Sequence, residues 1–449
     1  MRVAFATLGC KVNHYETQAM EALFRAAGWE VTDFDQQADV YVINTCTVTG
    51  VSDSKSRQLI ARAHNKNPQA LIAAVGCYAQ SDPKTVDALP GVGLVMGTDG
   101  RAAIVERVEE ALQKTQATPL SDDSAQPTLP QAQTGAAAES PVADSRGYHV
   151  FEPLSATADS RTRATLKIQD GCANYCAYCI IPYARGPIRS RSLADTKEQL
   201  FALANHGYRE IVLTGIHLAS YGRDLGDCDL LDVLSIARDV PGLERVRLGS
   251  LEPKFVDARV ARALADNPKV CRQFHLSLQS GSDPVLKRMR RRYTTAEYAQ
   301  AAALLRTYIP DCALTTDIIA GFCGETPEEH QQTLAFVKQM AFARIHVFPF
   351  SLRKGTAAAS MGGQLPKAVK QARAKELIAL GSQLTRDFLT ARLGTTDTVL
   401  IEQDGYGYTG NYIRVHTDVT GREGQIVPVK LVDLQDEIMI GKEIITSYE

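Results

Sequence analysis

The chain has 449 residues, too many for one ordinary hydrophobic core, so we expect two or three domains. Its apolar content of 45% and charged content of 22% are typical of a soluble globular protein, and no apolar run reaches the length of a membrane span. The N-terminus enters a strand pattern without a signal sequence, and the net charge of −2 neither favours nor excludes a nucleic-acid partner. We therefore expect a cytoplasmic protein that does not bind membranes.

Residues 1–112 alternate strand and helix signals, beginning with the strand pattern "RVAFATL". The next stretch predicts a helix in which Asn13 and Glu16 have the spacing of an N-cap and N3 pair, and Gly28 ends the helix. The later patterns are "EVTDF", "DVYVINT", the helical "SKSRQLIARAHNK", "LIAAVG" and "GLVMG". Strands that alternate with helices predict an α/β fold with an open parallel sheet, covered on both faces.

Residues 113–150 are rich in Ala, Ser, Pro and Gln and nearly free of large apolar side chains. Such a segment cannot bury enough surface to offset the entropy lost on ordering it. We therefore predict a disordered linker between two folded parts.

Residues 158–390 resume the alternation with six strand patterns, which are "ATLKIQ", "EIVLTGI", "RVRLGSL", "QFHLSLQ", "ALTTDIIAG" and "RIHVFPF". Helical stretches separate these strands, and six such units predict a partial (β/α)6 barrel, open on one side. After a charged helix, residues 391–449 contain short alternating strands with glycine turns. They predict a small antiparallel β-barrel at the C-terminus.

The loop "CANYCAYC" places Cys172, Cys176 and Cys179 directly after the first barrel strand, at the end where barrels keep their active sites. Ten cysteines in a cytoplasmic chain favour metal or redox ligands over a disulfide framework. No other Cys or His lies within ten residues of the loop. Three thiolates therefore suit a cubane iron–sulfur cluster with one open iron, the alternatives being a degenerate zinc loop or chance clustering.

Three further cysteines, Cys10, Cys46 and Cys77, each follow a predicted strand of the N-terminal sheet. The carboxyl ends of parallel strands lie along one edge, where ligands bind. A single cysteine at such a position is usually buried packing, but three at equivalent positions favour a second set of metal ligands. We expect the remaining cysteines to be structural, and they are Cys228, Cys271, Cys312 and Cys323.

The cysteine motifs resemble those of a large enzyme family and, within it, those of a smaller family. The cysteine loop on a six-unit barrel resembles the radical S-adenosylmethionine (SAM) enzymes, and nearly the whole chain resembles the methylthiotransferases. The motifs that carry the second resemblance are "TLGCKVNHYET", "NTCTVT", "GCYAQ", "CANYCAYCIIPYARGPIRSR", "HLSLQSGSDPVLKRMRR" and "HVFPFSLRKGT". The resemblance implies a methylthiotransferase domain over 1–112, a radical-SAM domain over 158–390 and an RNA-binding barrel of the type called TRAM over 391–449.

The family's cofactors are SAM and two 4Fe–4S clusters, so the resemblance assigns Cys10, Cys46 and Cys77 to an auxiliary cluster and the barrel loop to the cluster that binds SAM. It also implies an electron donor such as flavodoxin or ferredoxin. The resemblance implies that three residues at strand ends contact SAM, and these are Gly215, Ser250 and Glu252. The alternative is that these strand ends are polar without binding a ligand. No side-chain acid or nucleophile stands out as catalytic.

The substrate implied by the family is tRNA. Lys11, Val12 and Asn13 after the first cysteine resemble the branch that methylthiolates N6-threonylcarbamoyladenosine next to the anticodon. Basic side chains near the cluster loop and on the terminal barrel, where they stand among tyrosines, are predicted to bind RNA. They are Arg185, Arg189, Arg191 and Arg414. The basic run "LKRMRRRY" either binds phosphates of the RNA or forms a solvent-exposed helix face.

Three alternatives remain open at the level of sequence. A methylthiotransferase of this kind could act on another tRNA adenosine or on an aspartate of a ribosomal protein. The chain could instead be a non-catalytic iron–sulfur protein that binds RNA or carries electrons. The cysteines could also be zinc ligands in a structural protein.

Overall fold

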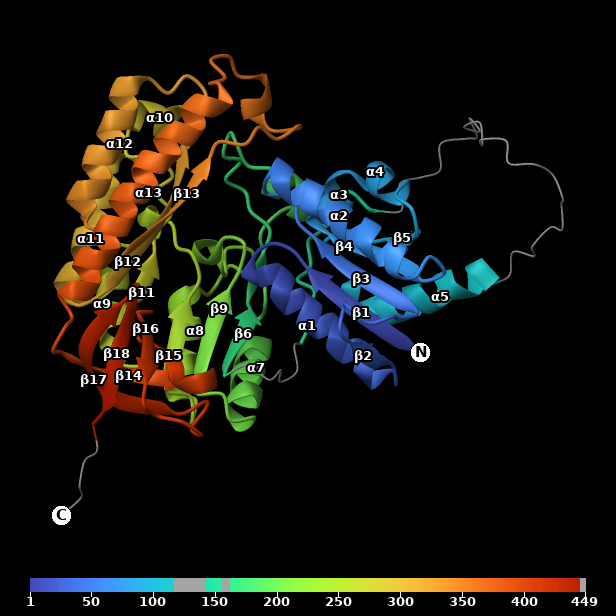
Figure 1. Ribbon diagram of the computed structural model, residues 1–449, viewed down its shortest axis with the longest axis horizontal. Helices are drawn as coiled ribbons and strands as arrows, with labels where there is room; N and C mark the ends of the chain where they lie inside the picture. The colour runs from blue at the N-terminus through green and yellow to red at the C-terminus, as the bar shows by residue number, and fades with distance from the viewer. Residues whose placement is uncertain (117–141, 156–161, 445–449) are drawn as a thin grey trace. The chain divides into compact units, whose positions relative to one another are not determined.

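The computed structural model describes residues 1–116, 142–155 and 162–444, and it divides into two compact units (Figure 1). The first unit comprises Met1–Tyr148, Leu154–Thr157 and Tyr183–Gly186. The second comprises the remaining segments, His149–Pro153, Ala158–Pro182 and Pro187–Glu449. Among the described helices, none is long and apolar enough to cross a membrane.

The first unit contains a five-stranded parallel sheet with the strand order β2-β1-β3-β4-β5. Its strands are β1 (Arg2–Thr7), β2 (Glu30–Thr32), β3 (Val40–Thr45), β4 (Leu71–Gly76) and β5 (Val92–Val95). Its helices are α1 (Lys11–Ala26), α2 (Gly50–Lys66), α3 (Cys77–Ser81), α4 (Pro83–Asp87) and α5 (Ile104–Gln116). Every residue of β3 and β4 is buried, as expected for a parallel sheet that is covered on both faces.

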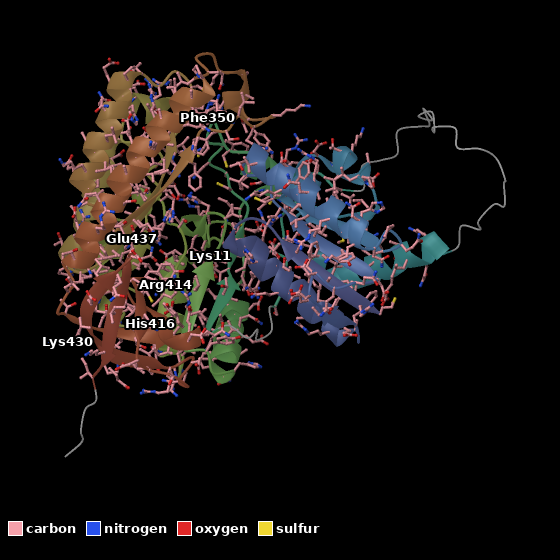
Figure 2. The ribbon with its side chains drawn as sticks, in the orientation of Figure 1. Lys11, Phe350, Arg414, His416, Lys430 and Glu437 are labelled. Carbon is pink, nitrogen blue, oxygen red and sulfur yellow. The ribbon has the colours of Figure 1, made fainter. Side chains whose placement is uncertain are left out.

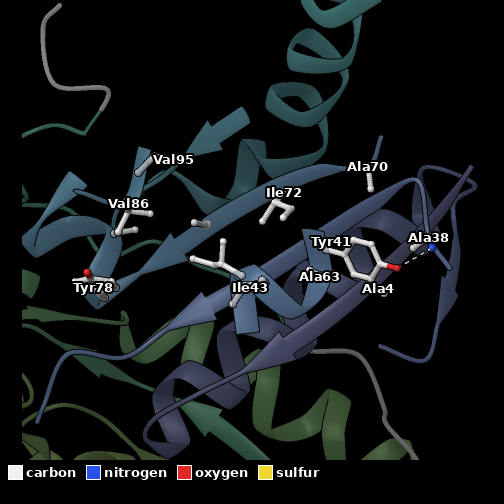
Figure 3. Packing of buried hydrophobic residues seen from close by; sticks show 13 residues of the cluster. Ala4, Ala38, Tyr41, Ile43, Ala63, Ala70, Ile72, Tyr78, Val86 and Val95 are labelled. Atoms are coloured by element: carbon white, nitrogen blue, oxygen red, sulfur yellow. Dashed lines mark hydrogen bonds between the residues drawn. The ribbon is translucent and has the colours of Figure 1, made fainter. Parts of the chain in front are cut away.

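Alternate residues of the central strands point into two separate hydrophobic cores. Tyr41, Ile43 and Ile72 pack with Ala63 of α2 on one face, as Figure 3 shows. Their neighbours along the strands pack with α1 and α5 on the other face, and these neighbours are Val40, Val42, Leu71 and Ala73. The period of two along each strand therefore places one helix layer against each face.

The helix α1 begins three residues earlier than the predicted N-cap implies. Cys10, and not Asn13, is the N-cap residue, and the Cys10 side chain makes no capping hydrogen bond. Asn13 and Glu16 are both buried, with 1% and 0% of their surface exposed. The predicted capping role of these two side chains is wrong, because both are committed to hydrogen bonds inside the unit.

The predicted linker over 113–150 falls largely on residues 117–141, which lie outside the described residues. The described part at its start completes α5, which extends to Gln116. At its other end Val142 packs against the core of the first unit, and Gln80 Nε2 donates a hydrogen bond to the carbonyl of Ala143 at 2.8 Å. These flanking residues belong to the fold and are not linker.

The second unit contains six parallel strands in two groups, β6-β9-β10 and β11-β12-β13. Isolated parallel bridges from Val246 to Val270 and from Leu251 to Leu276 connect the two groups. The strands are β6 (Arg163–Lys167), β9 (Glu210–Thr214), β10 (Arg245–Leu248), β11 (Gln273–His275), β12 (Ala313–Ala320) and β13 (Arg344–Pro349). Each of the six coincides with a predicted strand, which confirms the parallel α/β part of the predicted fold class.

Helices separate the six strands, as in a βα barrel. They are α7 (Leu193–Asn205), α8 (Leu230–Asp239), α9 (Ala258–Asp266), α10 (Asp283–Arg288), α11 (Thr295–Tyr308), α12 (Pro327–Met340) and α13 (Lys367–Thr390). A short antiparallel pair, β7 (Gln169–Asp170) with β8 (Arg189–Ser190), and the short helix α6 (Ile181–Arg185) flank the cysteine loop. Capping boxes at Thr294 and Thr326 fix the starts of α11 and α12.

The C-terminal residues form a closed five-stranded barrel in the order β14-β15-β16-β18-β17. Its strands are β14 (Thr396–Ile401), β15 (Tyr406–Thr409), β16 (Arg414–Thr417), β17 (Ile426–Gln435) and β18 (Ile438–Glu443). The predicted small barrel is confirmed, although β16 and β18 pair in parallel and the other pairs are antiparallel. Alternate residues such as Val399, Val415 and Val429 fill its core.

Buried arginines of β10 attach this barrel to the rest of the second unit. Arg247 donates hydrogen bonds to the carbonyls of Thr409 and Gly410, both at 3.1 Å, and forms an ion pair with Glu210 at 2.8 Å. The side chains of Arg247 and Glu210 are 1% and 0% exposed. Although burial raises the pKa of Glu210, the charge of Arg247 and its hydrogen bond hold it below the usual value.

We expect Arg247→Met to destabilise the second unit by about 3 kcal/mol, because it removes one partner of a buried ion pair. The measurement is the urea unfolding midpoint of the full chain. Arg209→Met is the matched control, since Arg209 pairs with Glu244 on the surface and should contribute less than about 1 kcal/mol. Equal unfolding midpoints for the two variants would contradict this role of Arg247.

Candidate functional site

Three cysteines of the first unit lie at the carboxyl ends of neighbouring parallel strands. Cys46 directly follows β3 and Cys77 directly follows β4, and the pairing of Thr45 with Gly76 sets these two ends side by side. Cys10 follows β1, and a methyl group on the adjacent Gly9 would lie 3.1 Å from the Cys46 Sγ. The structure therefore brings together residues that are far apart in the sequence.

Hydrogen bonds from two asparagines hold the cysteine-bearing loops in place. Asn13 Nδ2 donates to the carbonyls of Leu8 at 2.8 Å and Thr45 at 3.1 Å, so it joins the loop before Cys10 to the end of β3. Asn44 Nδ2 in turn donates to the carbonyl of Asn13 at 2.9 Å. Asn13 is thus a structural part of the site.

Gly76 allows the close approach of β3 and β4 at this edge. Its φ of +94° lies in the region that favours glycine, and a methyl group there would lie 2.4 Å from the Asn44 Oδ1. Cys46 and Cys77 are buried, while Cys10 is exposed. Burial raises the pKa of the Cys46 and Cys77 thiols, and a neighbouring cysteine raises each further.

The second cysteine set occupies the loop between β7 and α6. The Cys179 N–H donates to the Cys176 carbonyl at 2.9 Å, which closes a turn within the loop. Ala177 between them donates to the Met289 carbonyl at 2.9 Å and accepts from the Ala358 N–H at 2.7 Å. Burial raises the pKa of Cys172 to about 11 and that of Cys179 to about 12. The loop is therefore anchored on both sides, and its three thiols remain partly accessible.

Both sets have the donor chemistry of a cubane cluster with three protein ligands, because each brings three cysteines together and none of the other four cysteines belongs to either set. Within the described residues, no three His, Cys, Asp or Glu side chains converge as the ligands of a single metal ion. A four-iron cubane is larger than one ion, so its ligands need not converge so closely. The donor sets therefore fit iron–sulfur clusters better than zinc.

A polar network adjoins Cys176. Arg291 donates to the Cys176 Sγ at 3.2 Å and forms an ion pair with Glu252 at 3.1 Å. His217 Nε2 lies 3.2 Å from the other Glu252 oxygen, and Asn174 Nδ2 lies 3.3 Å from Glu252. Burial raises the pKa of Glu252, but the His217 hydrogen bond and the Arg291 charge outweigh it and hold the pKa at about 2. Glu252 is therefore ionised beside the cysteine loop.

Of the three residues predicted to contact SAM, only Glu252 lies within this network. Gly215 follows β9, and a methyl group there would lie 2.8 Å from the Gln169 Oε1, so packing alone requires a glycine. Ser250 follows β10 with its side chain exposed. Contacts between SAM and these three residues remain predictions.

Sequence reasoning missed three members of the network, Asn174, His217 and Arg291. Asn174 lies inside the cysteine loop and His217 follows a barrel strand, so position alone could have indicated both. Arg291 belongs to the basic run "LKRMRRRY", for which the sequence predicts either phosphate binding or a solvent-exposed helix face. Its side chain is 8% exposed and bound to Glu252, so neither interpretation holds for it.

The RNA-binding role predicted for three arginines after the cysteine loop is wrong. Arg185, Arg189 and Arg191 are each at most 1% exposed. Arg189 lies 3.6 Å from Asp170, and Arg191 lies 2.9 Å from Asp195. Buried guanidinium groups that are paired with carboxylates do not present themselves to phosphates. Arg185 belongs to the first unit, where it pairs with Glu16 at 2.9 Å.

Aromatic side chains on the C-terminal barrel fall into two groups. Tyr408 and Tyr412 stack on each other at 4.9 Å, and the Arg163 guanidinium lies over both rings, so these tyrosines contribute to packing within the unit. Tyr406 stacks on His416 at 4.4 Å and lies under the exposed Arg414. Figure 2 labels Arg414 and His416 on this barrel. The second group is the part of the barrel that resembles a surface for stacking RNA bases.

We expect Glu252→Gln to lower the stability of the metal-free chain by roughly 3 kcal/mol at pH 7, because Arg291 and His217 lose the carboxylate that they bind. The pKa of Glu252 is lowered on folding from 4.5 to about 2. Its stabilisation is therefore complete above pH 4.5 and disappears as the pH falls toward 2. Urea unfolding of both proteins at several pH values measures this.

The control for that comparison is Glu244→Gln, since Glu244 is 42% exposed in a surface pair. We expect it to have little effect at any pH. A difference between wild type and Glu252→Gln that does not shrink with acidification would refute the assignment of an ionised Glu252.

Comparisons with known proteins find relatives over nearly the whole chain. Residues 2–97 match the family described as "Uncharacterized protein family UPF0004", and residues 166–337 match the Radical SAM superfamily. The chain is 41% identical over 443 residues to the threonylcarbamoyladenosine tRNA methylthiotransferase MtaB of Bacillus subtilis, covering 96% of this chain and 93% of the relative. It is 36% identical over 444 residues to MtaB of Thermotoga maritima, covering 98% and 96%.

Among solved structures, the radical S-adenosylmethionine methyltransferase TsrM from Kitasatospora setae is similar with a TM-score of 0.57. The similarity covers 80% of this chain and 76% of TsrM at 16% sequence identity. At that identity the match supports the fold and nothing more specific.

Proposed function

The chain belongs to the radical-SAM tRNA methylthiotransferase family, and we propose that it converts N6-threonylcarbamoyladenosine next to the anticodon of tRNA to its 2-methylthio derivative. The observation that carries the proposal is the 41% identity to the Bacillus subtilis enzyme over 96% of this chain, with both three-cysteine sets present. The sequence Lys11-Val12-Asn13 after the first cysteine resembles that of the same branch and supports the same substrate.

We assign one 4Fe–4S cluster to each cysteine set. Cys172, Cys176 and Cys179 would hold the cluster that binds SAM, and Cys10, Cys46 and Cys77 would hold the auxiliary cluster. When bound, the clusters and SAM supply the one-electron and sulfur-transfer chemistry that protein side chains lack. A flavodoxin or ferredoxin is the expected electron donor.

The chain's own residues position these groups. Arg291 and Glu252 form a fixed charged pair against Cys176, which restricts the orientation of the SAM-site loop. The stack of Tyr406 and His416 under Arg414 offers aromatic rings and a positive charge to an RNA strand. The proposed reaction requires no side-chain nucleophile, because the cofactors supply the chemistry.

Analysis of tRNA nucleosides by mass spectrometry tests the substrate. In a strain lacking the gene, we expect 2-methylthio-N6-threonylcarbamoyladenosine to be absent and its unmodified precursor to accumulate. A plasmid-borne copy should restore the modification, and a copy carrying Cys172→Ala should not. Persistence of the modified nucleoside in the deletion strain would rule out the proposed substrate and direct attention to the ribosomal-protein alternative.

Cysteine variants test the separation of the two sites. Replacing Cys172, Cys176 or Cys179 with Ala should abolish formation of 5′-deoxyadenosine from SAM in the presence of dithionite. Replacing any residue of the auxiliary set should spare that cleavage and abolish methylthio transfer. Iron content should fall from about eight to about four atoms per chain in either case, as expected for two cubane clusters.

The control is Cys228→Ala, which should change neither activity nor iron content because Cys228 lies in neither set. Loss of SAM cleavage in the auxiliary-set variants would show that the two sites are not separable. Bound zinc in place of iron, or clusters without SAM cleavage, would instead favour the structural or non-catalytic alternatives.

A further inference from the structure

The basic run over residues 287–292 contains side chains that are paired with carboxylates and side chains that face solvent. Arg288 forms an ion pair with Glu329 at 2.6 Å, and Arg291 forms one with Glu252 at 3.1 Å. The other basic side chains of the run are exposed, and they are Lys287, Arg290 and Arg292. Within the described part of the chain, none of these three has an ion-pair partner. The role of the run therefore differs from one residue to the next.

The end of helix α10 places two of these exposed arginines outside the helix. The N–H of Arg290 donates to the carbonyl of Lys287 at 3.0 Å, just after the last helical residue, Arg288. Arg290 has a φ of +58°, in the left-handed region where a helix usually ends on glycine or asparagine. A basic side chain in the last turn stabilises the helix dipole. That explanation applies to Lys287 but not to Arg290 and Arg292, which lie beyond the helix.

This helix end lies against the cysteine loop of the second unit. The N–H of Ala177, inside the loop, donates to the carbonyl of Met289 at 2.9 Å. Ala177 and Met289 also belong to one hydrophobic cluster, in which both are fully buried. Arg291 donates to the Cys176 Sγ at 3.2 Å. The exposed arginines on either side of Arg291 therefore border the cysteine loop.

Lys354, which is also exposed, borders the same loop from a second segment of the chain. A methyl group on the next residue, Gly355, would lie 3.5 Å from the Cδ1 of Ile180, the residue after the last cysteine of the loop. The N–H of Ala358 donates to the carbonyl of Ala177 at 2.7 Å. Two segments far apart in the sequence thus bring exposed positive charges to this loop. We call these four side chains the basic rim, and they are Lys287, Arg290, Arg292 and Lys354.

Acidic residues are scarce along both segments of the rim. Residues 284–296 and 330–375 contain no Asp or Glu. Glu325 and Glu329, shortly before the second segment, are each bound by an arginine, at 2.7 and 2.6 Å. Asp283 is the acidic residue of α10, and its carboxylate accepts a hydrogen bond from the backbone at the start of α11 at 2.7 Å. Positive charge therefore predominates along the rim, although the chain as a whole is nearly neutral.

We propose that the basic rim binds backbone phosphates of the tRNA and holds the strand beside the cysteine loop. The proposal rests on the function proposed above, which makes tRNA the substrate. An RNA strand whose target base reaches the cysteine loop brings its phosphates to the residues that border that loop. Contacts to phosphates fix the position of a nucleic acid without reading its bases. The rim therefore complements the stack of Tyr406 and His416, which offers rings to the bases.

The experiment measures, by fluorescence anisotropy, how the full chain binds an anticodon stem-loop RNA that carries N6-threonylcarbamoyladenosine, over a series of KCl concentrations. Each phosphate contact contributes about 0.7 to 0.9 to the slope of log affinity against log salt. A triple variant with Lys287→Gln, Arg290→Gln and Arg292→Gln should therefore have a slope smaller by about 2, and affinity weaker by at least about tenfold at about 0.1 M salt. Lys354→Gln alone should reduce the slope by about 0.8.

A matched control removes the same amount of charge elsewhere in the second unit. It combines Lys197→Gln, Arg238→Gln and Arg262→Gln, three exposed positions on α7, α8 and α9. Because salt screens exposed charges beyond about 10 Å at 0.1 M, this control should change the slope by less than about 0.5. Arg290→Lys keeps the charge and should keep the wild-type slope. If the urea unfolding midpoint shows that the triple variant is unfolded, Arg292→Gln and Lys354→Gln, each expected to lower the slope by about 0.8, decide the question.

The proposal is overturned if the folded rim variants retain the wild-type slope, or if the control triple variant loses as much affinity as the rim variant. The second result would show that only the overall charge of the unit matters. If the wild-type chain binds this RNA at none of the salt concentrations, the proposed function fails. That outcome is distinct from tight wild-type binding that does not depend on the rim, which overturns the rim alone.

Discussion

The parallel register of β1, β3 and β4 is the constraint on which the N-terminal site depends. Because these strands are neighbours and run in the same direction, the residues that follow them meet at one sheet edge. The close approach leaves no room for a side chain at Gly76, and Asn13 and Asn44 donate hydrogen bonds to the carbonyls of Thr45 and Asn13. The cysteines contribute the chemistry, and the strand pairing brings them together.

In both units, buried arginines pair with glutamates and connect neighbouring parts of the fold. Arg185 pairs with Glu16, Arg247 with Glu210 and Arg291 with Glu252, and in each case the planar guanidinium also binds a further polar partner. Arg185 lies beside the N-terminal cysteines, Arg247 attaches the terminal barrel, and Arg291 contacts the loop of Cys172, Cys176 and Cys179. The chain is nearly neutral overall, so its charge distribution matters for local organisation more than its net charge.

The sequence predicted the fold far better than it predicted the roles of charged residues. The six strands of the two parallel groups in the second unit follow apolar patterns of short period, and such patterns depend only on which residues are buried. A run of arginines does not show whether its side chains are buried or exposed, because that depends on which carboxylates they pair with after folding. Glu16 is 169 residues from Arg185 in the sequence, so no local pattern could reveal that this guanidinium is buried.

The sequence by itself determined the two cysteine sets, the parallel and barrel-forming strands and the resemblance to a family, because spacing and periodicity are local properties. The tertiary structure alone decided which polar residues serve those sites. It buried Arg185, Arg189 and Arg191, left Arg414 exposed, and brought Asn174, His217 and Arg291 together beside the cysteine loop. The physical reason is that burial and pairing of a charge depend on residues that only folding brings into contact.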